Sequence, residues 1–287
     1  MNIKIIADST SDIDQELLKD LDLEILPLVI TVENREYLDG ETISIPEIYD
    51  IMRRGIFPTT AQIPYERAYD LFRSCLENGN DIIYIAFSSA MSGCYSVAQM
   101  AAEELRAEFP ERRITVLDSK GGSGATGLIV LQALRMASSG HEYDEILAEI
   151  IFMTEHVEHL FFVDDLQWLA KGGRVSKIVG TIGSKLGLHP MLEVKKGSIV
   201  FQKMIRGKKK SVRELADKLI ERAAHFPRQL IAIAHADDLP SARELEELIH
   251  KGLPNCLTTI CHIGCVLGAH IGLKGIGAFC FNQKSKH

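Results

Sequence analysis

Apolar runs that lead straight into hydroxyl-rich turns constrain the fold of this chain more than any other feature. The clearest case is the run at residues 82–87, followed by the turn at 88–93 and a helix-like stretch at 95–108. Such a turn presents free backbone N–H groups and hydroxyls at the positive end of a helix dipole, so it can hold an anion. It contains no lysine or arginine, which argues against a polyphosphate.

Residues 1 to 155 alternate apolar strands with helices. Because the strands are apolar throughout, they predict a mostly parallel sheet covered on both faces, which is a doubly wound α/β domain. Ligands of such sheets bind beyond the carboxyl ends of the strands. Strands are expected at 3–7, 24–31, 81–86 and 114–117, and helices are expected to begin near Asp12, Pro46, Pro64, Ser92 and Ser123.

The pattern changes after His156, where a hairpin around Lys195-Lys196-Gly197 and further helices predict an α+β domain over residues 156–287. Strands are expected at 160–163, 191–194, 198–204, 230–235 and 258–263, and helices at 166–170, 211–225 and 241–251.

The chain has 287 residues, 46% of them hydrophobic and 25% charged, as in ordinary globular proteins. Its apolar runs are far shorter than a membrane span of roughly 20 residues. Its first residues do not resemble a secretory signal, so a cytoplasmic protein is the default expectation. The group Cys256, Cys261, His262 and Cys265 lacks the second arm of a zinc site, so we expect no metal and half-buried thiols there.

Basic residues are concentrated between Lys171 and Arg213, where twelve Lys or Arg accompany one acid, Glu193. The whole chain carries −7, so this segment's net +11 leaves about −18 for the remainder, an asymmetry that suggests a partner surface. The densest part is Arg206-Gly207-Lys208-Lys209-Lys210. Taken by itself, this short run is equally typical of a helix start that is simply exposed to solvent. Phe201 is the only aromatic residue among these basic residues. This disfavours binding of nucleic acid, which usually also needs aromatic side chains for stacking.

Four hydroxyl-rich turns occur in the first half, and each alone is typical of a helix N-cap. We expect the parallel topology to gather them at one edge of the sheet, where together they line a site. They are Asp8-Ser9-Thr10-Ser11-Asp12, Pro58-Thr59-Thr60-Ala61-Gln62, Ser88-Ser89-Ala90-Met91-Ser92-Gly93 and Asp118-Ser119-Lys120-Gly121-Gly122-Ser123-Gly124.

Two enzymatic alternatives remain open. Residues Gly122 to Gly127 match the GxGxxG dinucleotide fingerprint, but they lie outside the first βαβ unit and lack the expected acid at the end of a second strand. A serine hydrolase could use Ser92 with His235 or His270 and Asp237, but the flanking glycines of a nucleophile elbow are missing around Ser92.

Small residues surround one histidine, His270, in the stretch 264–277. Glycines allow a backbone to approach a ligand closely, and an imidazole in such a loop can donate hydrogen bonds to a carboxylate.

Several motifs, in order along nearly the whole chain, together resemble the DegV family of bacterial fatty-acid-binding proteins, which is related to the FakB subunits of fatty acid kinase. The motifs are the segments 8–12, 58–62, 88–93 and 118–120, Leu169-Ala170-Lys171-Gly172-Gly173-Arg174-Val175-Ser176, and Gly268-Ala269-His270-Ile271-Gly272.

This resemblance implies two domains that hold one long-chain fatty acid between them. The carboxylate would contact Thr60, Ser92 and His270, and the acyl chain would enter an apolar tunnel. The acid would be presented to a separate ATP-dependent kinase for lipid metabolism, and this chain would supply no catalytic residue and need no cofactor. The residues expected to support the site are Ser9, Thr59, Gln62, Ser89, Gly93, Ser119 and Gly268.

The basic segment then acquires a role, because it could dock the acidic surface of a kinase or an anionic membrane. The residues expected to make this contact are Arg174, Lys177, Arg206, Lys208 and Lys209. The chain also departs from the family pattern, with Ala269, Ile271 and Leu273 around the histidine and Ala61 and Ile63 near Thr60. These replacements predict more apolar loops and an altered head-group geometry.

Overall fold

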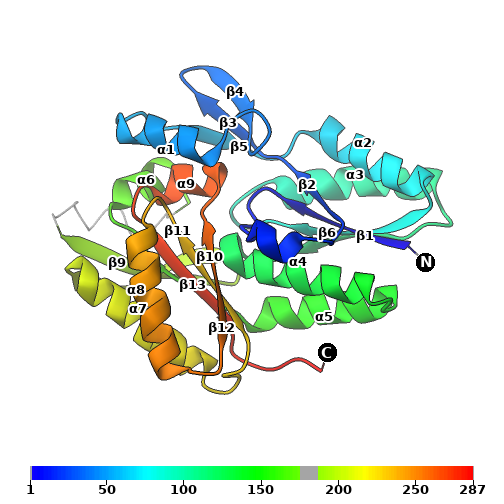
Figure 1. Ribbon diagram of the computed structural model, residues 1–287. Coiled ribbons are helices and arrows are strands. Elements are labelled where there is room, and N and C mark those ends of the chain that lie inside the picture. Colours follow the sequence, from blue (N-terminus) through cyan, green and yellow to red (C-terminus); the bar gives the residue numbers. More distant parts are fainter. Residues whose placement is uncertain (1, 175–186, 287) are drawn as a thin grey trace.

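The structure of the protein is a computed structural model that describes residues 2–174 and 187–286 (Figure 1). The first half contains a four-stranded parallel sheet in the order β2-β1-β6-β7. Its strands are β1 (Asn2–Asp8), β2 (Leu23–Leu26), β6 (Asn80–Ala86) and β7 (Ile114–Asp118). The predicted parallel α/β sheet is therefore confirmed.

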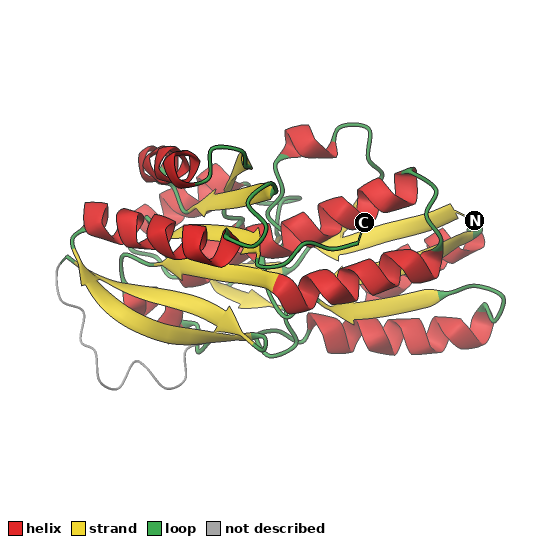
Figure 2. Ribbon diagram, turned by 90° about the horizontal axis from the view of Figure 1, so that it is seen from below, coloured by secondary structure: helices red, strands yellow, loops and turns green. Residues whose placement is uncertain are grey.

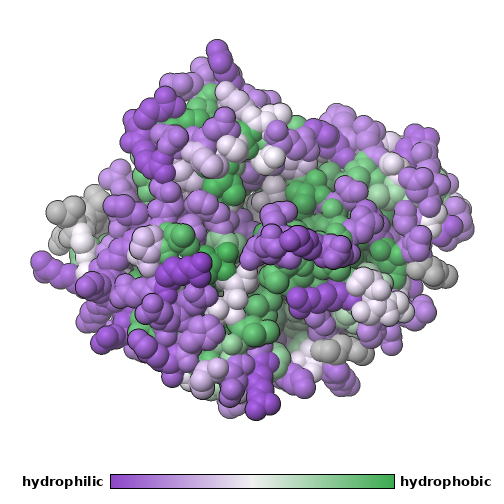
Figure 3. Space-filling model, in the orientation of Figure 1, coloured by the Kyte–Doolittle hydropathy of each residue, from purple (hydrophilic) through white to green (hydrophobic). Residues whose placement is uncertain are grey.

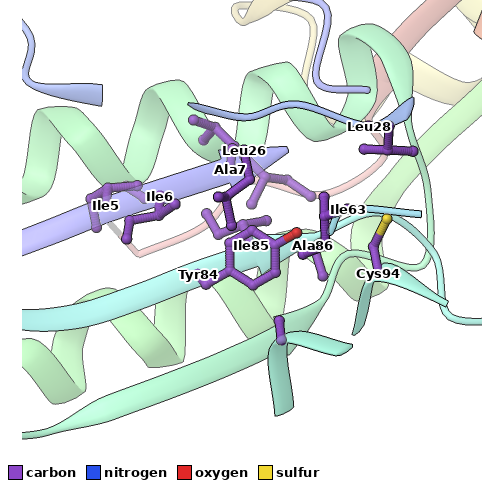
Figure 4. Packing of buried hydrophobic residues seen from close by; sticks show 14 of the residues in the cluster. Ile5, Ile6, Ala7, Leu26, Leu28, Ile63, Tyr84, Ile85, Ala86 and Cys94 are labelled. Atoms are coloured by element: carbon purple, nitrogen blue, oxygen red, sulfur yellow. The ribbon is translucent and has the colours of Figure 1, made fainter. Parts of the chain in front are cut away.

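Helices cover both faces of this sheet, because its strands are apolar on both sides. Helices α2 (Tyr65–Glu77) and α3 (Cys94–Glu108) pack on β6 and β7, and α4 (Ser123–Ser138) packs on β1 with α5 (Tyr143–His156) behind it (Figure 1). In Figure 4, Ile5, Ile6 and Ala7 of β1 lie beside Tyr84 and Ile85 of β6, and all five are at most 1% exposed.

A second, mixed sheet has the order β10-β9-β8-β13-β11-β12, in which only β11 and β12 pair in parallel. This confirms an α+β arrangement in the second half. Figure 2 shows the sheets side by side along the length of the molecule. The strands are β8 (Val157–Phe162), β9 (Leu188–Lys195), β10 (Ser198–Arg206), β11 (Leu230–His235), β12 (Leu257–His262) and β13 (Ile276–Phe281).

Helix α4 joins the two sheets. It contacts β1 of the first sheet and β8, β11 and β13 of the second, and 11 of its 16 residues are buried, as expected of a helix that is apolar all round. Helices α7 (Lys208–Ala223) and α8 (Leu239–Gly252) pack on each other and on the second sheet. None of the helices described by the structure is long and apolar enough to cross a membrane. Hydrophilic side chains cover most of the face shown in Figure 3, with apolar ones in smaller areas between them.

A small antiparallel sheet, β4-β3-β5, lies above the other two in Figure 1. It consists of β3 (Val29–Val32), β4 (Arg35–Leu38) and β5 (Thr59–Ala61). Helix α1 (Ile45–Arg53) and the short helix α9 (Cys265–Ile271) pack beside it, and α6 (Leu166–Lys171) contacts α9.

Two expectations about the first half are wrong. Residues 24–31 do not form one strand, because Pro27 separates β2 from β3 and the two strands belong to different sheets. Proline has no N–H for a ladder, and the chain leaves the parallel sheet there. Instead of an α-helix near Asp12, a single 3₁₀ turn forms at Gln15–Leu18.

Three further differences affect the expected site. The turn at 58–62 contains strand β5 of the small sheet, so only three of the four hydroxyl-rich turns follow strands of the parallel sheet. His270 lies in the last turn of α9 rather than in a loop. Strand β13, which was not expected, occupies an interior position of the second sheet between β8 and β11.

Candidate functional site

Thr60 and His270 meet where the small sheet and α9 pack together. The backbone of β5 pairs with β3, with Thr60 opposite Ile30, and α9 contacts both strands. Thr60 Oγ1 lies 2.7 Å from His270 Nε2, a hydrogen-bond distance. The sequence motifs at 58–62 and 268–272 are thus brought into one site.

The position of α9 is fixed at its N-terminus by buried carboxylates. Asp39 accepts hydrogen bonds from the backbone N–H groups of Cys265 and Val266, at 3.3 Å each. Asp12 accepts one from Gly264 at 2.8 Å and one from the hydroxyl of Ser123. These bonds satisfy donors that a helix start leaves free. They tie α9 to the loop after β1 and to the start of α4.

The imidazole of His270 is held as a neutral group. Burial lowers the pKa of His270 to about 4, and the nearby positive charge of Arg174 acts in the same direction. Its Nδ1 is buried without a hydrogen-bond partner among the described residues. This nitrogen lies against Gly172, where an added Cβ would come within 2.1 Å of it. Glycine is therefore required at position 172 for the ring to occupy this place.

Ser92 lies in the turn between β6 and α3, as expected. Its Oγ is 3.1 Å from Cys94 Sγ and accepts the Cys94 N–H at 3.3 Å. The side chain of Gln62 lies directly over Gly93, so closely that a Cβ there would sit 1.8 Å from its Oε1. The contact joins the Ser92 turn to the segment that follows Thr60.

A pocket, here called the Thr60 pocket, collects these groups. Its polar lining residues are Thr60, Ser92, Arg174 and His270, and the rest of its lining is apolar. Arg174 Nε donates to Met91 O at 3.2 Å and Nη1 to Gly172 O at 2.6 Å. The pocket therefore combines two hydroxyls, a neutral imidazole and one positive charge, a set suited to a single carboxylate.

A second pocket, here called the Phe279 pocket, shares part of its lining with the first. The two have five lining residues in common: Phe87, Met91, Ile199, Leu267 and Ile271. Beyond them the Phe279 pocket is lined by Phe161, Val194, Ile263, Ile276 and Phe279, with His159 in the wall. These side chains come from both the parallel sheet region and the mixed sheet. The two neighbouring pockets thus offer a polar lining around Thr60 and a mostly apolar lining around Phe279.

The family model described as "Uncharacterised protein, DegV family" matches residues 2–283 of this chain. The chain belongs to the DegV family. A DegV domain-containing protein of Clostridium acetobutylicum is 37% identical over 281 residues, which cover 96% of this chain and 97% of the relative.

Solved DegV structures have the same fold. One described as "Fatty Acid Binding of a DegV family Protein from Thermus thermophilus" is 28% identical, with a TM-score of 0.88 over 98% of this chain and 99% of that one. The Fatty Acid Kinase (Fak) B3 protein of Streptococcus pneumoniae, solved with linoleic acid, is similar in fold at 23% identity, with a TM-score of 0.88 over 99% of this chain and 100% of that one.

Several residues expected to support the site of this DegV protein hold loops together instead of lining either pocket. Ser9 Oγ accepts the Leu28 N–H at 3.1 Å, and Ser119 Oγ accepts from Thr126 Oγ1 at 3.1 Å. Ser89 bonds Asp118. Thr59 is exposed beside Thr60, and Gly268 allows the hydroxyl of Tyr49 to approach α9, since a Cβ there would lie 2.7 Å from it.

The enzymatic alternatives find little support in the contacts. The glycines of the 122–127 segment serve packing, because a Cβ at Gly124 would lie 2.8 Å from the Phe279 ring and one at Gly127 2.5 Å from the Asp12 carbonyl. Within the part of the chain that the structure describes, Ser92 has no hydrogen bond to a histidine, and the ring of His235 lies tilted against that of His262 with centroids 4.4 Å apart. The same part contains no group of three or more His, Cys, Asp or Glu placed to hold a metal.

The residues expected to dock a partner lie in different places. Arg206 and Lys209 are exposed at the junction of β10 and α7, whereas Lys208 forms an ion pair with Asp238. Lys177 lies outside the described residues. Arg174 lines the Thr60 pocket.

Sequence reasoning thus missed Arg174 as a pocket residue, and it missed His159 entirely. The one sequence signal for His159 was its position two residues before Phe161. Residues two apart in a strand place their side chains on the same face of the sheet.

Proposed function

We propose that this DegV protein binds one long-chain fatty acid in the joined Thr60 and Phe279 pockets, between a domain of residues 1–155 and a domain of residues 156–287. The observation that carries the proposal is that the polar lining of the Thr60 pocket adjoins the mostly apolar lining of the Phe279 pocket, with five lining residues in common. That shape corresponds to an amphiphile with one small head group. The Thermus relative, whose structure describes fatty-acid binding, supports the same ligand class.

The head group is bound by Thr60 and Ser92, with Arg174 supplying charge. His270 acts as a positioning residue through Thr60. With Nδ1 buried and unpartnered among the described residues, the proton of neutral His270 belongs on Nε2, from which it is donated to Thr60 Oγ1. The Thr60 hydroxyl then points its own hydrogen at the ligand carboxylate. A hydrogen bond to a charged acceptor contributes about 1.5–3 kcal/mol, more than one between neutral groups.

The acyl chain supplies most of the affinity. Each buried CH₂ group contributes roughly 0.8 kcal/mol, and the Phe279 pocket offers aromatic and aliphatic side chains along its length. Ile271 and Ala61, two departures from the family pattern, line the Thr60 pocket. They make the region around the head group more apolar and so strengthen the electrostatic contacts there, because water screens them less.

The protein acts as a carrier without catalytic residues of its own, and it presents the acid to a separate kinase or to a membrane for lipid metabolism. The exposed Arg206 and Lys209 support this part, because basic side chains are attracted to acidic protein surfaces and to anionic lipid.

Native mass spectrometry tests the binding function. Protein purified from a bacterial host is expected to carry the mass of one fatty acid, and the double variant Thr60→Ala, Ser92→Ala is expected to retain much less of it. The variant Thr59→Ala, changed at the exposed neighbouring threonine, serves as the matched control. Lipid-free wild-type protein in repeated preparations would contradict the proposal, and equal retention by the double variant would refute the assigned head-group residues.

A further inference from the structure

Cys94 lies directly behind the hydroxyl of Ser92. It is the first residue of α3, and its Sγ lies 3.1 Å from Ser92 Oγ. A thiol and a hydroxyl at this distance form a hydrogen bond in which either group can be the donor. The backbone N–H of Cys94 also donates to Ser92 Oγ, at 3.3 Å. The Ser92 hydroxyl is therefore held by two groups of one residue.

The two side chains have different surroundings. Of the two, only Ser92 lines the Thr60 pocket, and neither lines the Phe279 pocket. Cys94 is 0% exposed and belongs to the hydrophobic core, where Figure 4 shows its side chain near Ile63. A ligand in the Thr60 pocket therefore meets Ser92 and does not touch Cys94. Any influence of Cys94 on that ligand passes through the Ser92 hydroxyl.

A bound carboxylate fixes the direction of the bond between these two side chains. An ionised carboxyl group only accepts hydrogen bonds, so Ser92 gives its single hydroxyl hydrogen to a carboxylate in the pocket. Ser92 Oγ then has no hydrogen left for Cys94 Sγ, and their hydrogen bond persists only with the thiol as donor. The thiol has a hydrogen to give near pH 7, because burial raises the pKa of Cys94 to about 12.

We propose that Cys94 is a positioning residue whose thiol donates to Ser92 Oγ, which directs the Ser92 hydroxyl hydrogen into the Thr60 pocket and makes the site prefer an anionic head group to a neutral alcohol. This inference rests on the proposed fatty-acid binding and deepens it. Both lone pairs of Ser92 Oγ are then occupied by Cys94, through its N–H and S–H groups. An alcohol both donates and accepts, so it gains little from a hydroxyl held in one orientation.

Competition with a fluorescent fatty acid tests the inference with two ligands, hexadecanoic acid and 1-hexadecanol. Cys94→Ala removes the thiol and is expected to bind the acid about fivefold more weakly, the effect of one neutral hydrogen bond, with little change for the alcohol. Cys94→Ser keeps a donor at this place and is expected to restore most of the affinity for the acid. The control Cys75→Ala changes another buried cysteine, on α2, and should bind both ligands like wild type.

A double-mutant cycle shows whether Cys94 acts through Ser92. In a Ser92→Ala background the hydroxyl is absent, so the further change Cys94→Ala should lower the affinity for the acid by less than about twofold. Infrared spectroscopy follows the thiol itself, whose S–H stretching band is identified by its absence from Cys94→Ser. In the complex with hexadecanoic acid, this band should lie at lower frequency in wild type than in Ser92→Ala.

Three results would each overturn this inference while leaving fatty-acid binding intact. They are an equal effect of Cys94→Ala on the acid and the alcohol, additive losses in the double-mutant cycle, and a Cys94 band at the same frequency in the two complexes. Failure of wild-type protein to bind hexadecanoic acid would overturn the proposed function and the inference with it.

Discussion

Thr60 Oγ1 and His270 Nε2 are 2.7 Å apart although the two residues are 210 positions apart in the sequence. One belongs to a three-residue strand of the small sheet and the other to the last turn of α9. Their meeting closes the polar end of a site whose interior is apolar. Because neither side chain carries a net charge near pH 7, the pair can orient a hydroxyl toward an anion at small desolvation cost.

Replacing Thr60 by valine removes one hydroxyl and retains the branched shape. The variant Thr60→Val is expected to weaken fatty-acid binding about tenfold or more, because a hydrogen bond to a carboxylate contributes about 1.5–3 kcal/mol. Isothermal titration calorimetry with hexadecanoic acid measures the change. The control Thr59→Val alters the exposed neighbour and should bind like wild type; equal affinities for the two variants would remove Thr60 from the head-group site.

His270 offers a test of its role as a donor to Thr60. In His270→Gln the side-chain amide can replace the Nε2–H group, whereas His270→Phe fills the space without a donor. We expect affinity to fall in the order wild type, His270→Gln, His270→Phe, with about a tenfold loss for the phenylalanine variant from one misoriented hydroxyl. Similar losses in the two variants, at unchanged thermal stability, would show that His270 serves only to fill space.

The pH dependence of stability should reveal the buried Asp12. Burial raises the pKa of Asp12 to about 7, above its ordinary 3.8, so the folded state holds this proton more tightly than the unfolded state. The stability that the protonated carboxyl contributes is then complete below about pH 4, and it declines as the pH rises to about 7, by at most about 1.4 kcal/mol per pH unit.

Urea denaturation of wild type and Asp12→Asn across pH 4 to 8 checks this expectation. Asparagine cannot ionise, so the variant should become more stable relative to wild type as the pH rises. His159 and His270 titrate in the opposite sense, because burial lowers the pKa of each to about 4. Both histidines are present in wild type and in Asp12→Asn, so their contributions cancel in the difference between the two free energies of unfolding. Parallel stability curves would show that Asp12 keeps an ordinary pKa.

The basic residues at the start of α7 can be tested apart from the fatty-acid site. The double variant Arg206→Glu, Lys209→Glu is expected to bind phosphatidylglycerol vesicles about tenfold more weakly, since each basic residue near an anionic surface contributes about 1 kcal/mol. Vesicle binding by the wild type should weaken as salt increases. Fatty-acid retention should not change.

A matched double charge reversal, Arg67→Glu with Arg73→Glu, lies on α2, which is far from α7 in Figure 1. It should leave vesicle binding intact. Equal loss in this control would mean that vesicle binding follows net charge alone and that the surface at Arg206 and Lys209 has no special role.

The buried core could be predicted from the sequence. Where the prediction was wrong, the error has a physical cause. Runs such as Ile82–Ala86 are buried on both faces of a parallel sheet and are therefore apolar at every position, a signal that is local. Pro27 was the local sign that residues 24–31 are two strands. Strand β5 is only three residues long, and its partner β3 cannot be found from periodicity.

The site was only partly predictable. Ser92 stands where a turn after a strand should place it, but the approach of His270 to Thr60 depends on long-range packing of α9, which is fixed by Asp12 and Asp39. Arg174, which is expected from its place in a basic segment to contact a partner, is exposed and also lines the Thr60 pocket. Charge patterns along the chain do not reveal which side of a loop faces a cavity.

A crystal structure of protein purified without added lipid tests the central claim most directly. The account predicts elongated electron density that begins within hydrogen-bond distance of Thr60 Oγ1 and Ser92 Oγ and continues past Leu267 and Ile271 toward Phe279. Pockets filled only by ordered water, in crystals of protein from several hosts, would contradict the claim that this DegV protein carries a fatty acid.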